Sequence, residues 1–266
     1  MLERRIAANG VVYYVSPMLK SSGVPHAFST RIGGVSPAPF DSLNLGNPSG
    51  CATPDPDERV QENYRRLASA AGFVADRHRR CWVHQVHGPE VETVAAAASF
   101  ENGRPADALA TADAGAALAV RVADCVPVLI AGDDGRVVAA AHAGWRGVVG
   151  GVVPNAVRTA REIGAADLVA AIGPCIGPDA FEVGPEVAEA FLTAFPAESF
   201  VRERGGGKWT IDLRAAVRSQ LRASGVSGGR IDSTDRCTVR DGDEFFSHRR
   251  DNGITGRMAA MIAPRA

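Results

Sequence analysis

Three short apolar segments near the middle of the chain limit its possible folds more than any other feature of the sequence. Residues 117–122, 126–130 and 137–141 consist mostly of Ala, Val, Leu and Ile. Apolar runs of this length are typical of buried β-strands. The Asp133-Asp134-Gly135 sequence between the last two runs is typical of a tight turn. We therefore predict neighbouring buried strands, the last two of which form a hairpin.

Helical patterns occur on both sides of these strands. Residues 55–71 begin with a capping Asp55 and with Pro56 in the first turn, and apolar residues follow at helical spacing up to Gly72. Residues 212–224 and 185–195 are also predicted helices. Residues 148–163 have a helical pattern that Pro154 should kink or start late. Further strands are predicted at 81–86, 91–94, 170–172 and 257–262. The mixture of hairpins and crossovers predicts an α+β fold, and we expect residues 1–266 to form a single domain.

The composition excludes several classes of protein. Lys and Arg number 29 against 30 Asp and Glu, so no net field favours nucleic acid or an acidic membrane surface. No apolar run approaches the roughly 20 residues that span a bilayer, and the N-terminus has no apolar segment of a secretion signal, so we expect a cytoplasmic protein. The five cysteines are scattered singly, which argues against a disulfide framework.

The most informative candidate residues are Cys125, just before one predicted strand, and His142, just after the next. A hairpin would bring these strand ends together, although each side chain could instead be a packed core residue. Two more histidines lie in the segment Trp82-Val-His84-Gln-Val-His87. On a strand they would point to opposite faces, so only one of them can join the same site.

One Cys and two His from separate strands allow two chemistries. As metal ligands they suit Zn²⁺ and leave its fourth position open, which is typical of a catalytic site. As a covalent site, Cys125 would be a thiolate activated by His142, with Asp124 or another acid orienting the imidazole. The residues alone do not show whether the metal site or the covalent site is correct.

A second group is basic and glycine-rich. It contains Arg31 before Gly33 and Gly34, the segment Ser42-Leu-Asn44-Leu-Gly46, and Arg146 between Trp and Gly. Arginine beside glycines suits an anion such as phosphate, although a tight turn with a solvated arginine has the same pattern. The segment 244–251, with two Phe, His248 and several charges, could line a pocket or could simply pack.

Eight motifs occur in one order along the chain and together resemble a known family. They are Phe28-Ser-Thr-Arg-x-Gly-Gly-Val-Ser36, Ser42-Leu-Asn-Leu-Gly46, Gln85-Val-His-Gly88, Ala123-Asp-Cys-Val-Pro-Val-Leu129, Ala141-His-Ala-Gly-Trp-Arg-Gly147, Gly173-Pro-Cys-Ile-Gly-Pro178, Phe181-Glu-Val-Gly184 and Phe245-Phe-Ser-x-Arg-Arg-Asp251. From about Val24 onward the chain resembles the laccase-domain family, also called the purine nucleoside phosphorylase or polyphenol oxidase family. Bacterial members are sometimes named peptidoglycan editing factors.

The resemblance implies a layered α/β sandwich in which mixed β-sheets are flanked by helices. It implies a metal site formed by His87, Cys125 and His142, which selects Zn²⁺ over the Cys-His dyad, with copper as the alternative metal. It also implies phosphorolysis of purine nucleosides and methylthioadenosine, and deamination of adenosine. Arg31, Asn44 and Arg146 fall on motif positions that we assign to substrate or phosphate. We expect a monomer whose partners are purine nucleosides and phosphate.

Three other functions remain as hypotheses. A copper-dependent polyphenol oxidase is attached to the family by name, but a multicopper oxidase needs about ten His ligands, and this chain has six His. A cysteine hydrolase acting on peptidoglycan fragments would use Cys125 and His142 as nucleophile and base. A zinc-stabilised binding module would have no activity. Release of ammonia or free base from a nucleoside would separate the enzyme from the last two.

Overall fold

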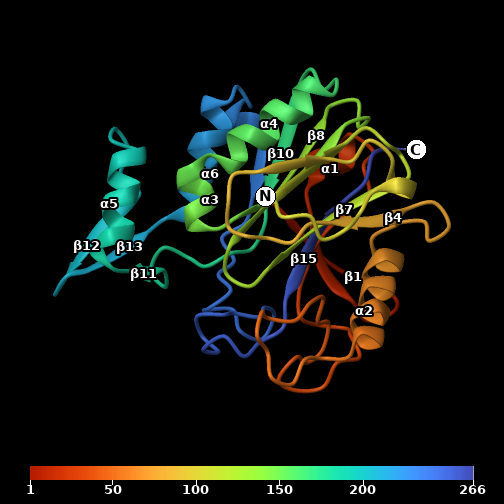
Figure 1. The fold of residues 1–266 in the computed structure, drawn as a ribbon, viewed down its shortest axis with the longest axis horizontal. Helices are drawn as coiled ribbons and strands as arrows, with labels where there is room; N and C mark the ends of the chain where they lie inside the picture. The colour runs from red at the N-terminus through yellow and green to blue at the C-terminus, as the bar shows by residue number, and fades with distance from the viewer. Residues whose placement is uncertain (266) are drawn as a thin grey trace.

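The computed structural model describes residues 1–265, in which two six-stranded mixed β-sheets pack face to face (Figure 1). The first sheet has the order β1-β2-β3-β15-β7-β4. Its strands are β1 (Glu3–Ile6), β2 (Val12–Val15), β3 (His26–Ser29), β4 (Arg79–Trp82), β7 (Ala116–Val122) and β15 (Met258–Ile262). The predicted strand at 81–86 is thus correct only as far as Trp82, while those at 117–122 and 257–262 are confirmed to within a residue.

The second sheet has the order β14-β10-β8-β9-β6-β5. Its strands are β5 (Val91–Thr93), β6 (Ala108–Thr111), β8 (Val126–Gly132), β9 (Val138–Ala143), β10 (Leu168–Ile172) and β14 (Ile231–Ser233). The predicted hairpin is confirmed, because β8 and β9 pair antiparallel around the Asp133–Gly135 turn.

Alternation along the strands decides which layer each side chain enters. In β7, Leu118 and Val120 pack between the two sheets, whereas Ala117 and Ala119 face α2 (Asp57–Ala70) on the outer surface of the first sheet. In β8, Leu129 packs between the sheets while its neighbours on either side face the helices on the outer surface of the second sheet. The molecule is therefore a layered α+β sandwich of the predicted kind.

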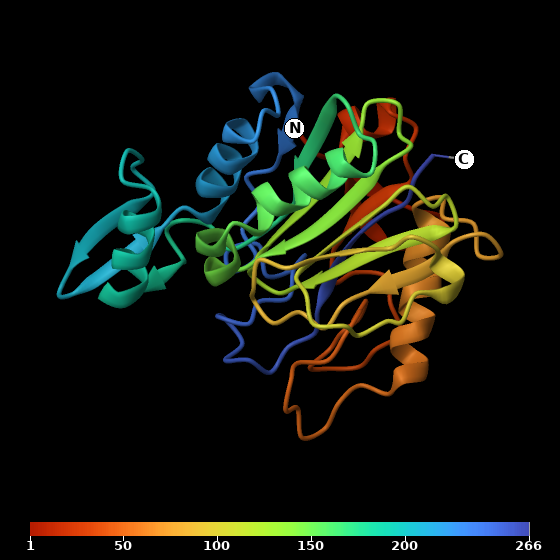
Figure 2. The same ribbon diagram turned by 45° about the horizontal axis from the view of Figure 1, so that its top comes forward.

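Three helices cover the outer face of the second sheet (Figure 2). They are α3 (Trp145–Gly150), α4 (Val152–Glu162) and α6 (Leu213–Ala223). The helical pattern over 148–163 forms parts of two helices, and α4 begins late, at Val152 close to Pro154, as predicted. The two helices are separate because Gly151 between them adopts a left-handed conformation with φ +87°. Pro154 lies in the first turn of α4, where its missing N–H would have had no partner within the helix.

The N-terminus of α2 also differs from the prediction. The helix begins at Asp57 after Pro56 and has no side-chain cap. The carboxylate of Asp55 instead accepts hydrogen bonds from the buried Ser36 hydroxyl and Asn44 amide. The Asp55 carboxylate is therefore buried against these two polar partners and does not cap α2.

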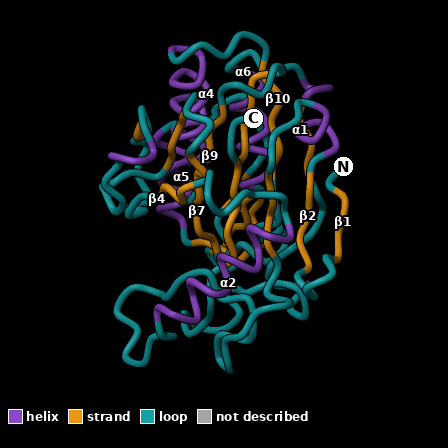
Figure 3. The backbone as a smooth tube through the Cα atoms, turned by 90° about the vertical axis from the view of Figure 1, so that its right-hand side faces the viewer, coloured by secondary structure: helices purple, strands orange, loops and turns teal. Residues whose placement is uncertain are grey.

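Two further features frame the site. A lobe formed by residues 178–212 extends from the sandwich (Figure 1) and contains β11 (Glu182–Val183), α5 (Pro185–Ala194), β12 (Val201–Gly205) and β13 (Lys208–Ile211). Loops gather at the end of the sheets near α2 (Figure 3), where Leu45 N–H donates to the Arg257 carbonyl at 2.9 Å. The remaining short helices are α1 (Pro17–Ser21), η1 (Ala97–Ser99) and η2 (Gly228–Arg230). None of the helices within residues 1–265 has both the length and the hydrophobicity needed to cross a bilayer.

Candidate metal centre

Cys125 lies in the tight connection between β7 and β8, directly before the first residue of β8. The preceding residue, Asp124, has a positive φ of 91°. Its carboxylate accepts hydrogen bonds from the Thr238 hydroxyl at 2.6 Å and from the Arg249 backbone N–H at 2.7 Å. Asp124 therefore fastens this turn to the C-terminal loop, and the expectation that it orients the His142 imidazole is not supported by these contacts.

His142 lies inside β9, not beyond its end, and pairs in register with Pro127 of β8. The hairpin thus carries the imidazole to Cys125, as the sequence predicted. The Nδ1 atom of His142 is 2.7 Å from the Oδ1 atom of Asp107, which precedes β6 on the other side of β9. Both side chains are buried. Asp107 is the carboxylate that orients the imidazole, and sequence reasoning missed it.

His87 follows β4 in an irregular segment and adopts a positive φ of 62°, an uncommon conformation for a residue with a side chain. Asp107 holds this segment, because its carboxylate accepts hydrogen bonds from the backbone N–H groups of Val86 at 3.1 Å, His87 at 3.0 Å and Gly88 at 2.7 Å. One buried carboxylate therefore positions two histidines from separate elements.

His84 does not join the site. Regular pairing of β4 ends at Trp82, and His84 forms an isolated bridge with Pro105 and is exposed. The face alternation argued from the sequence assumed a continuous strand here, so that argument was wrong, although the separation of the two histidines that it predicted is observed.

The three side chains form a compact donor set. One ligand atom from each of His87, Cys125 and His142 lies within 4.8 Å of the others, and the two imidazole rings meet edge to face at a centroid distance of 4.9 Å. Within residues 1–265 this is the one such group of His, Cys, Asp or Glu. Gly144 makes the close approach possible, since a Cβ there would lie 2.7 Å from His87 Cδ2 and 3.2 Å from Cys125 Sγ.

The donor chemistry fits a divalent transition metal. One thiolate and two imidazoles suit zinc or copper, and three protein ligands leave an open position. In such sites a ligating histidine usually donates the N–H of its other ring nitrogen to a carboxylate, which fixes the orientation of the ring. Asp107 supplies this carboxylate, and leaves Nε2 of His142 to face Cys125.

The same residues perturb one another's ionisation in the metal-free protein. Burial raises the pKa of the Cys125 thiol, but the charge of His142 and hydrogen bonds from His142 and His87 outweigh it and lower this pKa to about 6. Burial lowers the pKa of His142, but the Cys125 thiolate and the Asp107 carboxylate outweigh it and raise this pKa to about 9. The site therefore favours a thiolate beside a protonated imidazole, and a thiolate is the form that binds metal.

A cavity of about 480 Å³ opens onto this donor set, within the range of roughly 300–1,000 Å³ common for small-molecule sites. Its walls come from both sheets, the lobe and the C-terminal loop. The lining residues are Asn47, Pro48, Ser49, Gln85, His87, Arg121, Ala123, Asp124, Cys125, His142, Ile176, Phe181, His248, Arg249, Gly253 and Arg257. His248 and Arg249 confirm that part of the 244–251 segment lines a pocket.

The three remaining predicted site residues lie elsewhere. Arg31 is ion-paired with Asp41 at 3.2 Å and stacks 4.7 Å from the Phe246 ring centroid, in a different hollow. Arg146 is exposed near the start of α3. Asn44 is fully buried and does not line the cavity; its side chain bonds to the Asp55 carboxylate and to backbone N–H groups.

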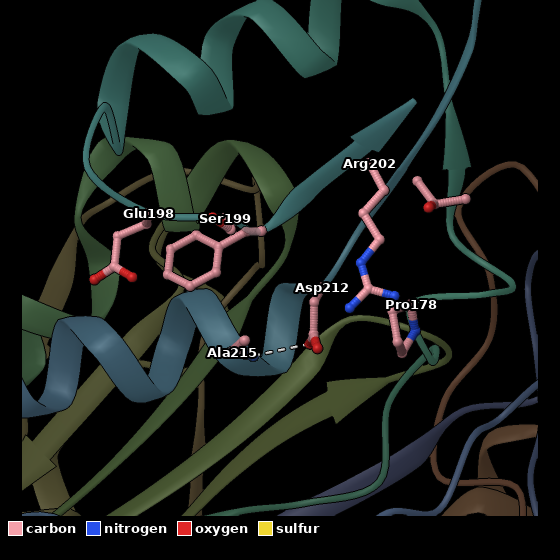
Figure 4. A pocket seen from close by; sticks show the side chains of 8 residues that line it. Pro178, Glu198, Ser199, Arg202, Asp212 and Ala215 are labelled. Atoms are coloured by element: carbon pink, nitrogen blue, oxygen red, sulfur yellow. Dashed lines mark hydrogen bonds between the residues drawn. The ribbon is translucent and has the colours of Figure 1, made fainter. Parts of the chain in front are cut away.

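A second cavity, of about 280 Å³, lies where the lobe meets α6 (Figure 4). Its lining includes Glu198, Arg202 and Asp212. Asp212 caps α6 by accepting the Ala215 N–H at 2.9 Å, so its carboxylate has a structural role. This cavity contains none of the metal-ligand candidates.

Comparison with known proteins gives a consistent result. The family model described as multi-copper polyphenol oxidoreductase laccase matches residues 25–265. The purine nucleoside phosphorylase YlmD of Geobacillus stearothermophilus is 39% identical over 256 residues, which cover 92% of this chain and 91% of that protein. The purine nucleoside phosphorylase YfiH of Escherichia coli is 41% identical over 245 residues, covering 90% and 93%. The crystal structure of YlmD from Geobacillus stearothermophilus is similar with a TM-score of 0.85 at 37% identity, over 99% of both chains.

Proposed function

The chain belongs to the family described as multi-copper polyphenol oxidoreductase laccase, and from that premise we propose that it is a zinc-dependent purine nucleoside phosphorylase that also deaminates adenosine and cleaves methylthioadenosine. The observation that carries the proposal is the His87–Cys125–His142 donor set, open to a cavity of small-molecule size. Relatives at about 40% identity are named purine nucleoside phosphorylases, which supports the substrate class.

The bonds that form and break in the proposed reactions define what the site must bind. In phosphorolysis an oxygen of inorganic phosphate forms a bond to C1′ of the ribose while the C1′–N9 bond breaks. The bonding electrons leave with the base, which takes up a proton, and the products are free purine and ribose 1-phosphate. In deamination water adds to C6 of adenosine and ammonia leaves. Both reactions need a held nucleoside, and only the first needs phosphate.

Residues of the metal centre and of the cavity wall would have separate roles in these reactions. Asp107 accepts the Nδ1–H of His142, so the Nε2 lone pair is free to bind a metal. The environment of Cys125 favours its thiolate, the third donor. Zn²⁺ bound by these residues would supply Lewis-acid chemistry and make water nucleophilic near neutral pH. Phe181, half-buried in the cavity wall, offers an aromatic face suited to stacking by a purine.

One observation favours a second candidate function. The Cys125 side chain contacts His142, which in turn contacts the Asp107 carboxylate. A cysteine nucleophile, its base and an acid that orients the base are arranged in the same way. In the metal-free protein this arrangement would support a cysteine hydrolase acting on peptidoglycan fragments. A copper-dependent polyphenol oxidase has less support, since residues 1–265 hold one three-ligand group rather than several.

The decisive experiment combines metal analysis with product analysis. Protein with measured zinc content is incubated with inosine, adenosine or methylthioadenosine, with and without phosphate, and the products are separated chromatographically. We expect hypoxanthine and ribose 1-phosphate from inosine only when phosphate is present. Hypoxanthine and free ribose at the same rate in phosphate-free buffer would contradict the phosphorylase and leave a hydrolase. Cys125→Ala should lose zinc and turnover together; zinc retained without turnover would favour the cysteine nucleophile.

A further inference from the structure

Two arginines face the metal-centre cavity from neighbouring strands. Arg121 is in β7 and Arg257 directly precedes β15, and both line the cavity. These strands are antiparallel, with Arg121 opposite Ala259. Arg257 is two residues before Ala259, so the alternation of side chains places both arginines on the same face of the sheet.

Neither arginine has a carboxylate partner. The Arg257 Nη1 atom donates to the carbonyls of Thr255 and Gly256, each at 3.0 Å. The Arg121 guanidinium carbon lies 5.3 Å from the Trp82 ring centroid. No ion pair joins either guanidinium to an acid among residues 1–265, and both oxygens of the nearby Asp124 accept hydrogen bonds from other groups.

Two unpaired positive charges on one half-buried wall are costly unless an anion pairs with them. Burial, followed by the repulsion of Arg121, lowers the pKa of Arg257. Arg31 and Arg250, which lie in a different hollow, both have acidic partners. The metal-centre cavity therefore carries positive charge at Arg121 and Arg257 that no acid of the described residues neutralises, whereas the two arginines of the other hollow are paired.

The segment Asn44–Gly46 builds this wall. The fully buried Asn44 accepts hydrogen bonds through Oδ1 from the backbone N–H of Arg257 at 2.9 Å and of Gly46 at 3.1 Å. Gly46 lies against Arg121 so closely that a Cβ would be 2.8 Å from Arg121 Cδ. Asn44 and Gly46, which do not line the metal-centre cavity, thus fix the backbone of one arginine and make room for the side chain of the other.

We propose that Arg121 and Arg257 form the subsite for the phosphate co-substrate, with Asn44 and Gly46 as its positioning residues. The proposal rests on the proposed function and replaces Arg31 and Arg146 in that role. Two guanidinium groups can share the oxygens of one phosphate and neutralise its charge. The anion would then lie in the same cavity as Cys125, whose charge acts on Arg257, and beside the nucleoside whose C1′ it attacks.

The test measures phosphate and nucleoside separately in the zinc-loaded protein. Arg121→Gln and Arg257→Gln should each raise the KM for phosphate about tenfold or more, while the KM for inosine changes little. Arg257→Lys should recover part of the loss, because it restores charge without the planar fork. Arg146→Gln is the matched control and should leave both constants unchanged. Adenosine deamination, which needs no phosphate, reports whether each variant is correctly folded.

Calorimetric titration of inorganic phosphate without nucleoside separates this inference from the proposed function. Weak phosphate binding in both Gln variants and normal binding in Arg146→Gln would support the subsite even if wild-type protein made no ribose 1-phosphate. An unchanged phosphate affinity, or a rise confined to the KM for inosine, would overturn it. If the Gln variants do not fold, phenylglyoxal labelling of wild-type protein decides: phosphate should protect Arg121 and Arg257 but not Arg146, and equal labelling with and without phosphate would overturn the subsite.

Discussion

Replacing Asp107 by Asn should weaken metal binding although no ligand is changed. The carboxylate accepts four hydrogen bonds: Oδ1 from His142 Nδ1 and the His87 N–H, and Oδ2 from the Val86 and Gly88 N–H groups. An Asn side chain has one acceptor oxygen, so whichever way it turns, two of these four donors face an amide NH₂.

The expected magnitude follows from these contacts. Loss of a partner to a ligating histidine typically costs 10–100-fold in metal affinity, or about 1.4–2.7 kcal/mol. Two donors left without acceptors should also reduce the free energy of unfolding by about 1–3 kcal/mol, less than two fully buried groups would cost, because the Val86, His87 and Gly88 N–H groups are only partly buried. The two effects have different readouts, because chelator competition measures the metal affinity and urea unfolding of the metal-free protein measures stability.

Asp232→Asn is the matched control. Asp232 is also a buried acid, and it accepts hydrogen bonds from the Ser16 hydroxyl at 2.6 Å and the Met18 N–H at 3.2 Å. Its loss should reduce stability and leave the metal affinity unchanged. Wild-type zinc affinity in Asp107→Asn would refute the positioning role, whatever the stability of that variant.

Further predictions concern the other parts of the centre. Gly144→Ala should lower zinc affinity by at least about tenfold, because the added methyl group meets His87 and Cys125 in the space a ligand set needs; chelator competition showing no loss would contradict this. His84→Ala should keep full zinc content while His87→Ala loses it, and equal losses by metal analysis would place the wrong histidine in the site. In the metal-free protein, alkylation of Cys125 by iodoacetamide should rise as pH increases through about 6, because the reactive thiolate forms above its lowered pKa. Burial raises the pKa of Cys81 to about 11, so that thiol should stay unlabelled over the same range, and bound zinc should protect Cys125.

The sequence predicted the local parts of this fold well. Asp133-Asp134-Gly135 and the flanking apolar runs determine the β8–β9 hairpin through neighbouring residues alone, and the helix predicted over 212–224 is observed as α6. The strand order was not predictable in this way. β15 lies between β3 and β7, and no local pattern states which distant strands pair.

In the site, too, contacts within one hairpin were predictable from the sequence, and contacts between distant segments were not. Cys125 and His142 were brought together correctly because the hairpin connects them. Asp107 was missed because its contact with His142 crosses from β6 to β9, and an acid at the start of an apolar run looks like a turn residue in the sequence. Arg31 was assigned to phosphate from its position in a family motif, but its charge is matched by Asp41, a pairing that the sequence could not show.

We propose that His87, Cys125 and His142 together hold one metal ion and that phosphorolysis requires this ion. The most direct measurement is a titration of Zn²⁺ into metal-free protein in the presence of inosine and phosphate, with ribose 1-phosphate as the measured product. We expect no product without metal and a rate that rises linearly to a plateau at one equivalent. Full phosphorolysis in the metal-free protein, or a plateau that Cys125→Ala reaches equally well, would contradict this proposal.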